Sequence, residues 1–291
     1  MKKHINFILI LIISALLCSC STKEYEIFFD SMGGSQVDSI LKEYKSGISD
    51  LPIPNKLNQH FMGWYLDESF EEELSYDFMT NFDLKLYAKW DYIEGLEYEI
   101  QNNEVVITNY FGNKDDLYIP MGIEGYSVTT IGNNAFSFVN LQNVKIPQSV
   151  TRIEAYAFAA TGLTIVTIPK GLVIIGEGAF DWAKIESFNI GSNKNFVYEN
   201  NLLLTYDENT LIAGIGYLTN VTIPNSVTKI EGYAFAFNNL TTITIPKNVT
   251  DIGDFAFFSN KLTSINILGD QTRFNNIWND IGFPYNLMTH S

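Results

Sequence analysis

The chain has 291 residues, 46% of them hydrophobic, so it is long enough for two domains with a substantial core. It carries 18 basic and 33 acidic residues, and a net charge of −15 disfavours nucleic acid as a partner. The two cysteines, Cys18 and Cys20, lie near the start, which excludes disulfides, thiolate zinc sites and a cysteine nucleophile from the rest of the chain.

The first twenty residues have the pattern of an export signal. Two lysines precede a mostly apolar run, residues 5–17, which is shorter than the roughly 20 residues that span a bilayer core. Residues 17–20, Leu-Cys-Ser-Cys, resemble a bacterial lipobox, which implies that Cys20 is diacylated and becomes the mature N-terminus. The alternative is a plain secretory signal cleaved after Ser19. We therefore predict a lipoprotein signal peptide at residues 1–20 and a lipid-anchored protein at the cell surface.

The segment from residue 25 to residue 92 predicts a small β-rich module. Apolar and polar residues alternate in 25–30 and again in 84–90, which is the period of a half-buried strand. Gly33-Gly34 predicts a turn directly after the first of these strands.

Several short motifs of this segment occur in the order found in Listeria–Bacteroides repeats, also called InlB B-repeats. The motifs are Phe29-Asp30-Ser31 with Gly33-Gly34, Pro52 and Pro54, Phe61 with Gly63-Trp64-Tyr65, and Leu86-Tyr87-Ala88-Lys89-Trp90. Met32 and Asn58-Gln59 depart from the family pattern in two loops. The resemblance implies a β-grasp-like module of bacterial surface proteins that serves as a spacer or weak interaction unit and has no catalytic role.

The remainder of the chain repeats with a period of 22 residues. The dipeptide Ala-Phe recurs in this register, with one longer step of 55 residues, at Phe136, Phe158, Phe180, Phe235 and Phe257. Columns of Leu, Val and Ile keep the same spacing. A fixed period of this length predicts a solenoid, in which stacked coils turn each apolar column into a continuous buried ladder.

A single coil predicts two extended pieces and a turn. Residues 240–245 alternate with their Leu and Ile side chains inward, and Pro246 ends this strand because it lacks a donor for the ladder. Residues 248–252 predict a second extended piece. We expect residues 255–257, Phe-Ala-Phe, to form a helical turn.

The coil pattern VTxI…AF…L…I-P resembles the BspA-like leucine-rich repeats in their 22-residue form. Residues 98–110 resemble the opening hairpin of that family, residues 196–214 a hairpin insertion that explains the longer step, and residues 269–284 the closing segment. The resemblance implies a mainly β leucine-rich-repeat solenoid with short helical turns and terminal caps over residues 96–291. It also implies a role in adhesion.

Candidate catalytic and metal-ligating residues are few. His60 and His290 have no partner at ligand spacing. Gly-Ile-Gly at 214–216 lacks the third glycine and the βαβ context of a dinucleotide loop. The acidic tract 67–73 could hold calcium, but it lacks the Asp/Asn alternation and central glycine of a calcium loop, so we interpret it as a solvated face. We predict no enzyme, no cofactor and no metal site.

These patterns predict a non-catalytic surface lipoprotein that binds an extracellular protein or glycan through its solenoid. The adhesion role comes from the family resemblance, since a fold does not fix a function. The alternative is a structural spacer or envelope component without a specific ligand. A glycoside hydrolase would need two carboxylates at a fixed separation in a cleft, which a regular solenoid wall does not readily provide.

The outward positions of three successive strands offer a candidate ligand surface, because they are polar but uncharged. We call this set the threonine face: Thr219, Asn220, Thr222, Thr241, Thr242, Thr244, Thr263, Ser264 and Asn266. Rigid, charge-depleted surfaces suit the centres of interfaces, so we predict that ligand binds here. The alternative is that threonine is simply a good strand former. A rival surface is the aromatic column Phe138, Trp182 and Phe237, unless these rings pack as a partly buried ridge.

Overall fold

The computed structural model describes residues 23–48, 50–75, 78–270 and 288–289. The signal peptide and lipobox expected at residues 1–20 and most of the closing segment expected at 269–284 lie outside the described residues. Within the described ranges the chain is built from strands and turns without a helix. No helix there is therefore long and apolar enough to cross a membrane.

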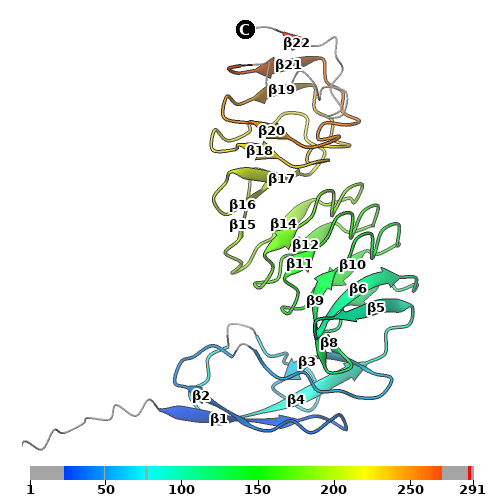
Figure 1. Cartoon of the computed structure of the whole chain (residues 1–291), viewed down its shortest axis with the longest axis vertical. Helices are drawn as coiled ribbons and strands as arrows, with labels where there is room; N and C mark the ends of the chain where they lie inside the picture. The colour runs from blue at the N-terminus through cyan, green and yellow to red at the C-terminus, as the bar shows by residue number, and fades with distance from the viewer. Residues whose placement is uncertain (1–22, 49, 76–77, 271–287, 290–291) are drawn as a thin grey trace, which may run out of the picture.

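Four strands form the N-terminal module at one end of the molecule (Figure 1). They are β1 (Glu24–Asp30), β2 (Ile40–Glu43), β3 (His60–Tyr65) and β4 (Leu84–Asp91). Their order is β2-β1-β4-β3, with β1 and β4 parallel and the other pairs antiparallel. Ile27, Trp64 and Leu86 are buried in the core of the module. Both strands expected in this segment are confirmed, as is the turn at Gly33-Gly34.

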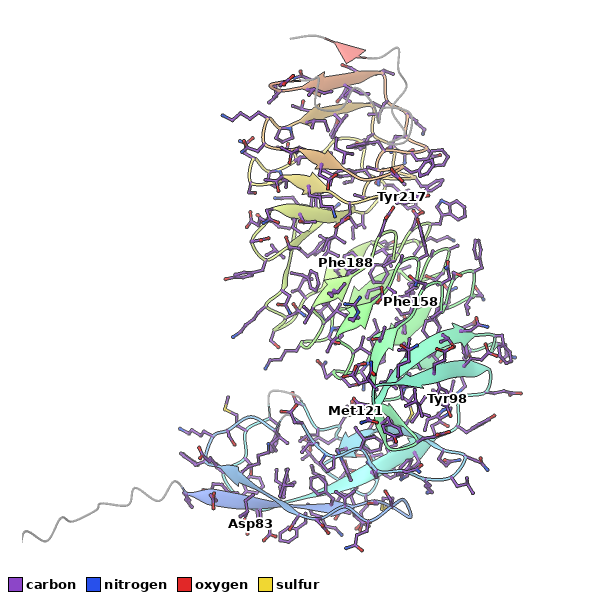
Figure 2. All side chains as sticks on the ribbon, in the orientation of Figure 1. Asp83, Tyr98, Met121, Phe158, Phe188 and Tyr217 are labelled. Atoms are coloured by element: carbon purple, nitrogen blue, oxygen red, sulfur yellow. The ribbon has the colours of Figure 1, made fainter. Side chains whose placement is uncertain are left out.

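The module and the solenoid share one sheet. Strand β8 (Gly122–Ile123) pairs with β3 on one side and with β9 (Tyr126–Ile131) on the other. The N–H of Met121 donates to the carbonyl of Phe61 at 2.8 Å, and Met121 packs against the module core. Backbone hydrogen bonds therefore cross the joint, where Figure 2 labels Met121.

The solenoid opens with the expected hairpin. It consists of β5 (Leu96–Gln101) and β6 (Glu104–Tyr110), which pair antiparallel. The linking residues Asn102 and Asn103 have φ of 52° and 65°, the left-handed values that a two-residue hairpin turn requires and that asparagine tolerates. Strand β6 then pairs parallel with β9, which starts the stack of coils.

The coils contribute short strands to parallel ladders on two sides of the stack (Figure 1). The first side contains β9, β11 (Arg152–Ile153) and β13 (Ile174–Ile175), and later β17 (Thr210–Gly214), β18 (Lys229–Ile230) and β20 (Asp251–Ile252). The second side contains β7 (Asp116–Tyr118) with β10 (Asn143–Lys145), β12 (Ile165–Thr167) with β14 (Ser187–Asn189), and β19 (Thr242–Ile245) with β21 (Ser264–Ile267) and β22 (Met288–Thr289).

The longer step in the repeat is the expected hairpin insertion. Strands β15 (Phe196–Glu199) and β16 (Leu202–Thr205) pair antiparallel, and β16 pairs antiparallel with β17. The described ladders do not continue from β13 to β17 or from β14 to β19. We therefore distinguish an N-terminal half, with the coils of Phe136, Phe158 and Phe180, from a C-terminal half, with those of Phe235 and Phe257.

The repeated apolar columns form the core, as the period predicts. The Phe rings of neighbouring coils stack nearly parallel, with centroids 5.1 and 5.7 Å apart in the N-terminal half and 5.3 Å apart in the C-terminal half. The Leu column and the Ile column beside them are mostly buried. Because each coil places the same side chain above its counterpart, the repetition itself generates the packing.

The expected helical turn around Ala-Phe is not confirmed. In every coil the residues two before and two after the Phe have positive φ, as at Phe255 with 54° and Ser259 with 55°. A right-handed helix requires φ near −63° at each residue, so these left-handed positions keep the Ala-Phe segment a tight turn. The two columns are Asn134, Tyr156, Gly178, Tyr233 and Phe255 before the Phe, and Phe138, Ala160, Trp182, Phe237 and Ser259 after it.

Candidate ligand-binding surfaces

The threonine face lies on the second side of the C-terminal half, along and beside β19 and β21. Seven of its nine residues are exposed, and Ser264 and Asn266 are half-buried. Thr242 is in register with Ser264, and Thr244 with Asn266, so the predicted columns form across these two coils. Residues 219–222, expected as the strand of the preceding coil, are not in a strand. The hydroxyl of Thr263 donates to the carbonyl of Thr241 at 3.1 Å. The structure thus brings these residues together as an uncharged, exposed ladder.

The aromatic column lies on the edge that the Ala-Phe turns form. Phe138 is 73% exposed, Trp182 is 52% exposed and Phe237 is half-buried. Each residue has positive φ, so the backbone turns its side chain away from the core while the preceding Phe stays inside. The ring of Phe138 reaches that of Trp182 at 6.2 Å because Ala160, between them in the repeat, is small.

This column continues across the boundary between the two halves. The ring centroid of Trp182 lies 5.0 Å from that of Phe237, and Phe237 lies 5.5 Å from Phe258. All contacts are edge-to-face, the geometry that aromatic pairs favour. We call Phe138, Trp182, Phe237 and Phe258 the aromatic ridge. A contiguous run of exposed rings on a protein surface indicates an interaction site.

A second row of rings runs beside the ridge. The ring of Tyr156 lies 5.5 Å from that of Tyr233, which lies 5.3 Å from Phe255. The coil between Tyr156 and Tyr233 has Gly178, where an added Cβ would lie 2.6 Å from the Tyr156 ring. A glycine at this position therefore lets the two tyrosines meet across the boundary between the halves.

The hairpin coil lacks the Ala-Phe turn at this boundary. The N–H of Gly214 donates to the carbonyl of Ala234, as the N–H of Phe235 donates to the carbonyl of Ala256 in the next coil. Gly214 thus stands where the other coils have Phe, and an added Cβ would lie 2.4 Å from Cε1 of Phe235. At this position the coil contributes no ring to the column of stacked Phe side chains or to the ridge, and a cavity of about 280 Å³ lies between the two halves.

Aromatic side chains and one carboxyl line this cavity. They include Trp182, Tyr217, Tyr233, Phe237 and Asp181. Figure 2 shows Tyr217 between the two halves of the solenoid. The Oδ1 atom of Asp181 accepts the N–H of Trp182 at 3.0 Å. Burial raises the pKa of Asp181 to about 6, because the charged carboxylate is separated from water.

Further carboxylates lie near the cavity. The side chain of Glu177 crosses the boundary between the halves, since a Cβ added to Gly232 would lie 2.0 Å from its Oε1 atom. Burial raises the pKa of Glu177, and the negative charges of Asp254 and Glu231 raise it further. This part of the edge therefore has a negative electrostatic potential. A positive charge that approaches it would stabilise the ionised carboxylates.

His60 and the acidic tract 67–73 form hydrogen bonds within the N-terminal module. His60 accepts the N–H of Ile93 at its Nδ1 atom, at 3.2 Å, and burial lowers its pKa. In the acidic tract, the side chain of Asp67 accepts the Ser69 hydroxyl and the N–H of Glu72, which lowers its pKa to about 2. Among the described residues no group of three or more His, Cys, Asp or Glu could hold a metal ion. His290 lies outside the described residues.

Sequence reasoning found both surfaces but missed the cavity. Asp181 and Tyr217 belong to no repeated column of similar residues, so the periodicity does not single them out. The available signal was the step of 55 residues, which marks a coil without Ala-Phe. In the sequence Gly214 is visible only as part of a Gly-Ile-Gly stretch. Its position in the Phe column is seen only when the neighbouring coils are aligned.

Stacked parallel coils with buried Leu, Ile and Phe columns define a leucine-rich-repeat solenoid. The BspA type leucine rich repeat region matches this chain in six copies, at residues 123–203 and 210–279, which together make up more than half of the sequence. The chain belongs to the BspA-type leucine-rich repeat family. The Listeria-Bacteroides repeat domain matches residues 25–89, which confirms the second resemblance.

Relatives and solved structures resemble parts of the chain. A protein of Evansella cellulosilytica described as a Gly-rich membrane protein is 44% identical over 71 residues, 23% of this chain and 8% of that protein. Another described as a membrane protein is 43% identical over 70 residues, 10% of its length. The pneumococcal vaccine antigen PcpA is 24% identical, with a TM-score of 0.46, and covers 52% of this chain and 38% of its own. A leucine rich cell surface protein from Faecalibacterium prausnitzii is 20% identical, with a TM-score of 0.41, over 60% of this chain and 75% of its own.

Proposed function

We propose that this chain is a non-catalytic binding protein of the bacterial cell surface, and that its solenoid recognises a protein ligand through the aromatic ridge. The observation that carries the proposal is the exposure of Phe138, Trp182 and Phe258 in one continuous run of ring contacts. Aromatic residues are enriched at protein interfaces and dominate their binding energy. The stacked coils hold these rings in place, so binding costs little ordering entropy.

A surface location is supported by the start of the sequence and by the relatives. Residues 1–20 have the pattern of a lipoprotein signal, and the two Evansella cellulosilytica relatives are described as membrane proteins. We propose that Cys20 carries the lipid. Cys20→Ser should then leave a protein that no longer partitions with membranes after fractionation. Membrane association that persists after removal of the leader would overturn this assignment.

The ridge is a stronger candidate than the threonine face because its exposed atoms are apolar. Burying rings removes apolar area from water, whereas burying hydroxyls and amides requires a matching hydrogen bond for each group. The rings of the ridge meet edge-to-face, which gives an uneven relief with edges as well as faces. Such relief suits the side chains of a protein better than the C–H faces of sugar rings, which pack best on an open aromatic face. The threonine face remains the sequence-based prediction.

The proposal can be tested by capture. The chain from Thr22 to Ser291 would be immobilised and exposed to host and bacterial surface extracts, beside a ridge variant carrying Trp182→Ser and Phe237→Ser. We expect a protein that is retained by the parent chain and lost from the ridge variant. A matched control carrying Thr242→Glu and Thr244→Glu should retain it, because it changes exposed residues outside the ridge. A glycan retained in place of a protein, or a protein that both variants hold equally, would contradict the proposal.

A rigid spacer is the second candidate. The observation in its favour is the sheet shared by the module and the solenoid, with Phe61 and Gly122 paired across the joint. Such a joint would hold the solenoid at a fixed angle from its anchor. The spacer hypothesis predicts that the parent chain retains no specific protein from any extract, so the capture experiment separates the two functions.

A further inference from the structure

The cavity between the two halves has the size of a side-chain pocket. Its volume of about 280 Å³ lies just below the range that small-molecule sites occupy, roughly 300–1,000 Å³. It lies on the same edge as the aromatic ridge, because Trp182 and Phe237 belong to both. A protein seated on the ridge would therefore place one of its side chains over the cavity.

The rings around the cavity favour a cation. Trp182 and Phe237 lie edge-to-face at 78°, so they present ring surfaces in two directions, and Tyr217 and Tyr233 also line the cavity. The faces of aromatic rings carry partial negative charge and attract ammonium and guanidinium groups, with Trp the most effective. Trp182 and Tyr217 are both more than half exposed, so a ligand can reach them.

The carboxyl groups favour the same ligand. Within the part of the chain that the structure describes, the side chain of Asp181 has one hydrogen-bond partner, the N–H of Trp182. Its second oxygen is available to a donor. Glu177, Glu231 and Asp254 add negative charge nearby, and Lys229 is paired with Glu231 at 2.9 Å. Burial raises the pKa of Asp181, and this half-buried carboxylate has no ion pair among the described residues.

We propose that this cavity is a specific pocket for an arginine side chain of the protein ligand, with the guanidinium against the rings of Trp182 and Phe237 and paired with Asp181. A planar guanidinium stacks on aromatic rings and donates several hydrogen bonds to a carboxylate, which a compact ammonium does less well. The proposal rests on the proposed function, because it names the group that the ligand presents to the ridge.

The test uses a small probe in place of the ligand. N-acetyl-arginine methylamide would be titrated at pH 7.5 into ¹⁵N-labelled protein while the indole N–H resonance of Trp182, assigned with Trp182→Phe, is followed. We expect a saturable shift with a Kd of about 1–10 mM, a range suited to one side chain. N-acetyl-citrulline methylamide, which has nearly the same shape without the charge, should not shift it. Asp181→Asn should weaken arginine binding at least about fivefold, whereas Thr242→Glu with Thr244→Glu should leave it unchanged.

Two results would overturn the pocket. One is the absence of a shift up to about 50 mM probe, and the other is equal binding of the arginine and citrulline compounds. Neither result depends on the capture experiment. If the ridge variant loses a protein ligand while the probe fails, the arginine pocket alone is wrong. If the probe binds as expected while no ridge-dependent protein is captured, the pocket stands and the proposed function is wrong.

Discussion

The two halves of the solenoid share a repeat of 22 residues but complete the Ala-Phe turn in different ways. In the N-terminal half the carbonyl of Phe136 accepts the N–H of Val139 at 3.3 Å, and the equivalent bond forms at Phe180. In the C-terminal half the carbonyl of Phe235 accepts side-chain amides instead, from Asn238 at 3.2 Å and Asn260 at 2.8 Å. At Phe158 the carbonyl accepts the hydroxyl of Thr161 at 2.9 Å. The same backbone group is therefore satisfied by a backbone N–H or a hydroxyl in the N-terminal half, and by side-chain amides in the C-terminal half.

This difference shows that one set of interactions fixes the register of the coils and another set fixes the conformation of the Ala-Phe turn. The stacked Phe rings are common to both halves, so the apolar columns set the register. The amides of the C-terminal half also join successive coils, because the Oδ1 atoms of Asn238 and Asn260 accept the N–H groups of Leu218 and Leu240. The C-terminal half should therefore depend on two asparagines that have no amide counterpart in the N-terminal half.

Removing a core ring should have the largest effect on stability. Phe158 lies between two stacked rings, whereas Phe235 stacks on Phe257 alone and rests on Gly214. We expect Phe158→Ala to cost about 4–5 kcal/mol and Phe235→Ala about 3–4 kcal/mol in urea unfolding. Phe237→Ala, at a half-buried ring, should cost less than about 2 kcal/mol. Small and equal losses at all three positions would contradict the register of the core.

Removing an amide should distinguish the halves directly. Asn238→Ala leaves the N–H of Leu218 and the carbonyl of Gly214 without their partner, so we expect a loss of about 2–3 kcal/mol in urea unfolding. The equivalent residue Ala183 shows that the N-terminal half tolerates alanine there. Asn239→Ala is the matched control and should change stability by less than about 0.5 kcal/mol. Equal effects at Asn238 and Asn239 would show that the amides do not hold the turn.

Burial of Asp181 at the boundary between the halves should lower the free energy of unfolding in a pH-dependent way. The pKa of Asp181 is about 6 in the folded protein against 3.8 when exposed, so folding loses stability as pH rises between these values. Asp181→Asn removes the buried charge and should raise stability at pH 7.5 by about 1 kcal/mol, allowing for solvent screening at a half-buried group. Thermal unfolding from pH 7.5 to pH 4 should show this advantage shrinking. An advantage that does not change with pH would contradict burial of the Asp181 carboxylate as its cause.

The smallest expected effect concerns the left-handed positions, which both halves share. Ala160 and Ser259 have φ of 55° in equivalent positions, where glycine avoids the clash of a Cβ. We expect Ala160→Gly and Ser259→Gly each to stabilise the protein by about 0.5–1 kcal/mol in chemical denaturation. Thr242→Gly, within strand β19, should destabilise it by a similar amount. Opposite signs in the two halves would show that the turns differ in backbone geometry as well.

Much of the fold could be predicted from the sequence because each repeated column keeps the same kind of side chain at the same place in every coil. The Phe and Leu columns, both hairpins and the strand ended by Pro246 were predictable, since each depends on local chemistry or on the period. The left-handed residues were not, because Tyr156, Trp182 and Phe255 are residues that seldom adopt positive φ. The cavity was not predictable either, since it arises where Gly214 replaces Phe and two distant coils meet. The threonine face was visible as a pattern, but its exposure alone does not select a ligand.

The central claim is that the solenoid binds a protein through its aromatic ridge, and the most direct test is an affinity comparison. The captured protein would be titrated against the parent chain, the ridge variant and the variant with Thr242→Glu and Thr244→Glu, with melting temperatures measured in parallel. We predict that the ridge variant binds at least about thirtyfold more weakly, as expected for the loss of hot-spot aromatics, while the threonine variant binds as the parent chain does. Loss of binding in the threonine variant, with the ridge variant unaffected, would contradict this claim and place the ligand on the threonine face.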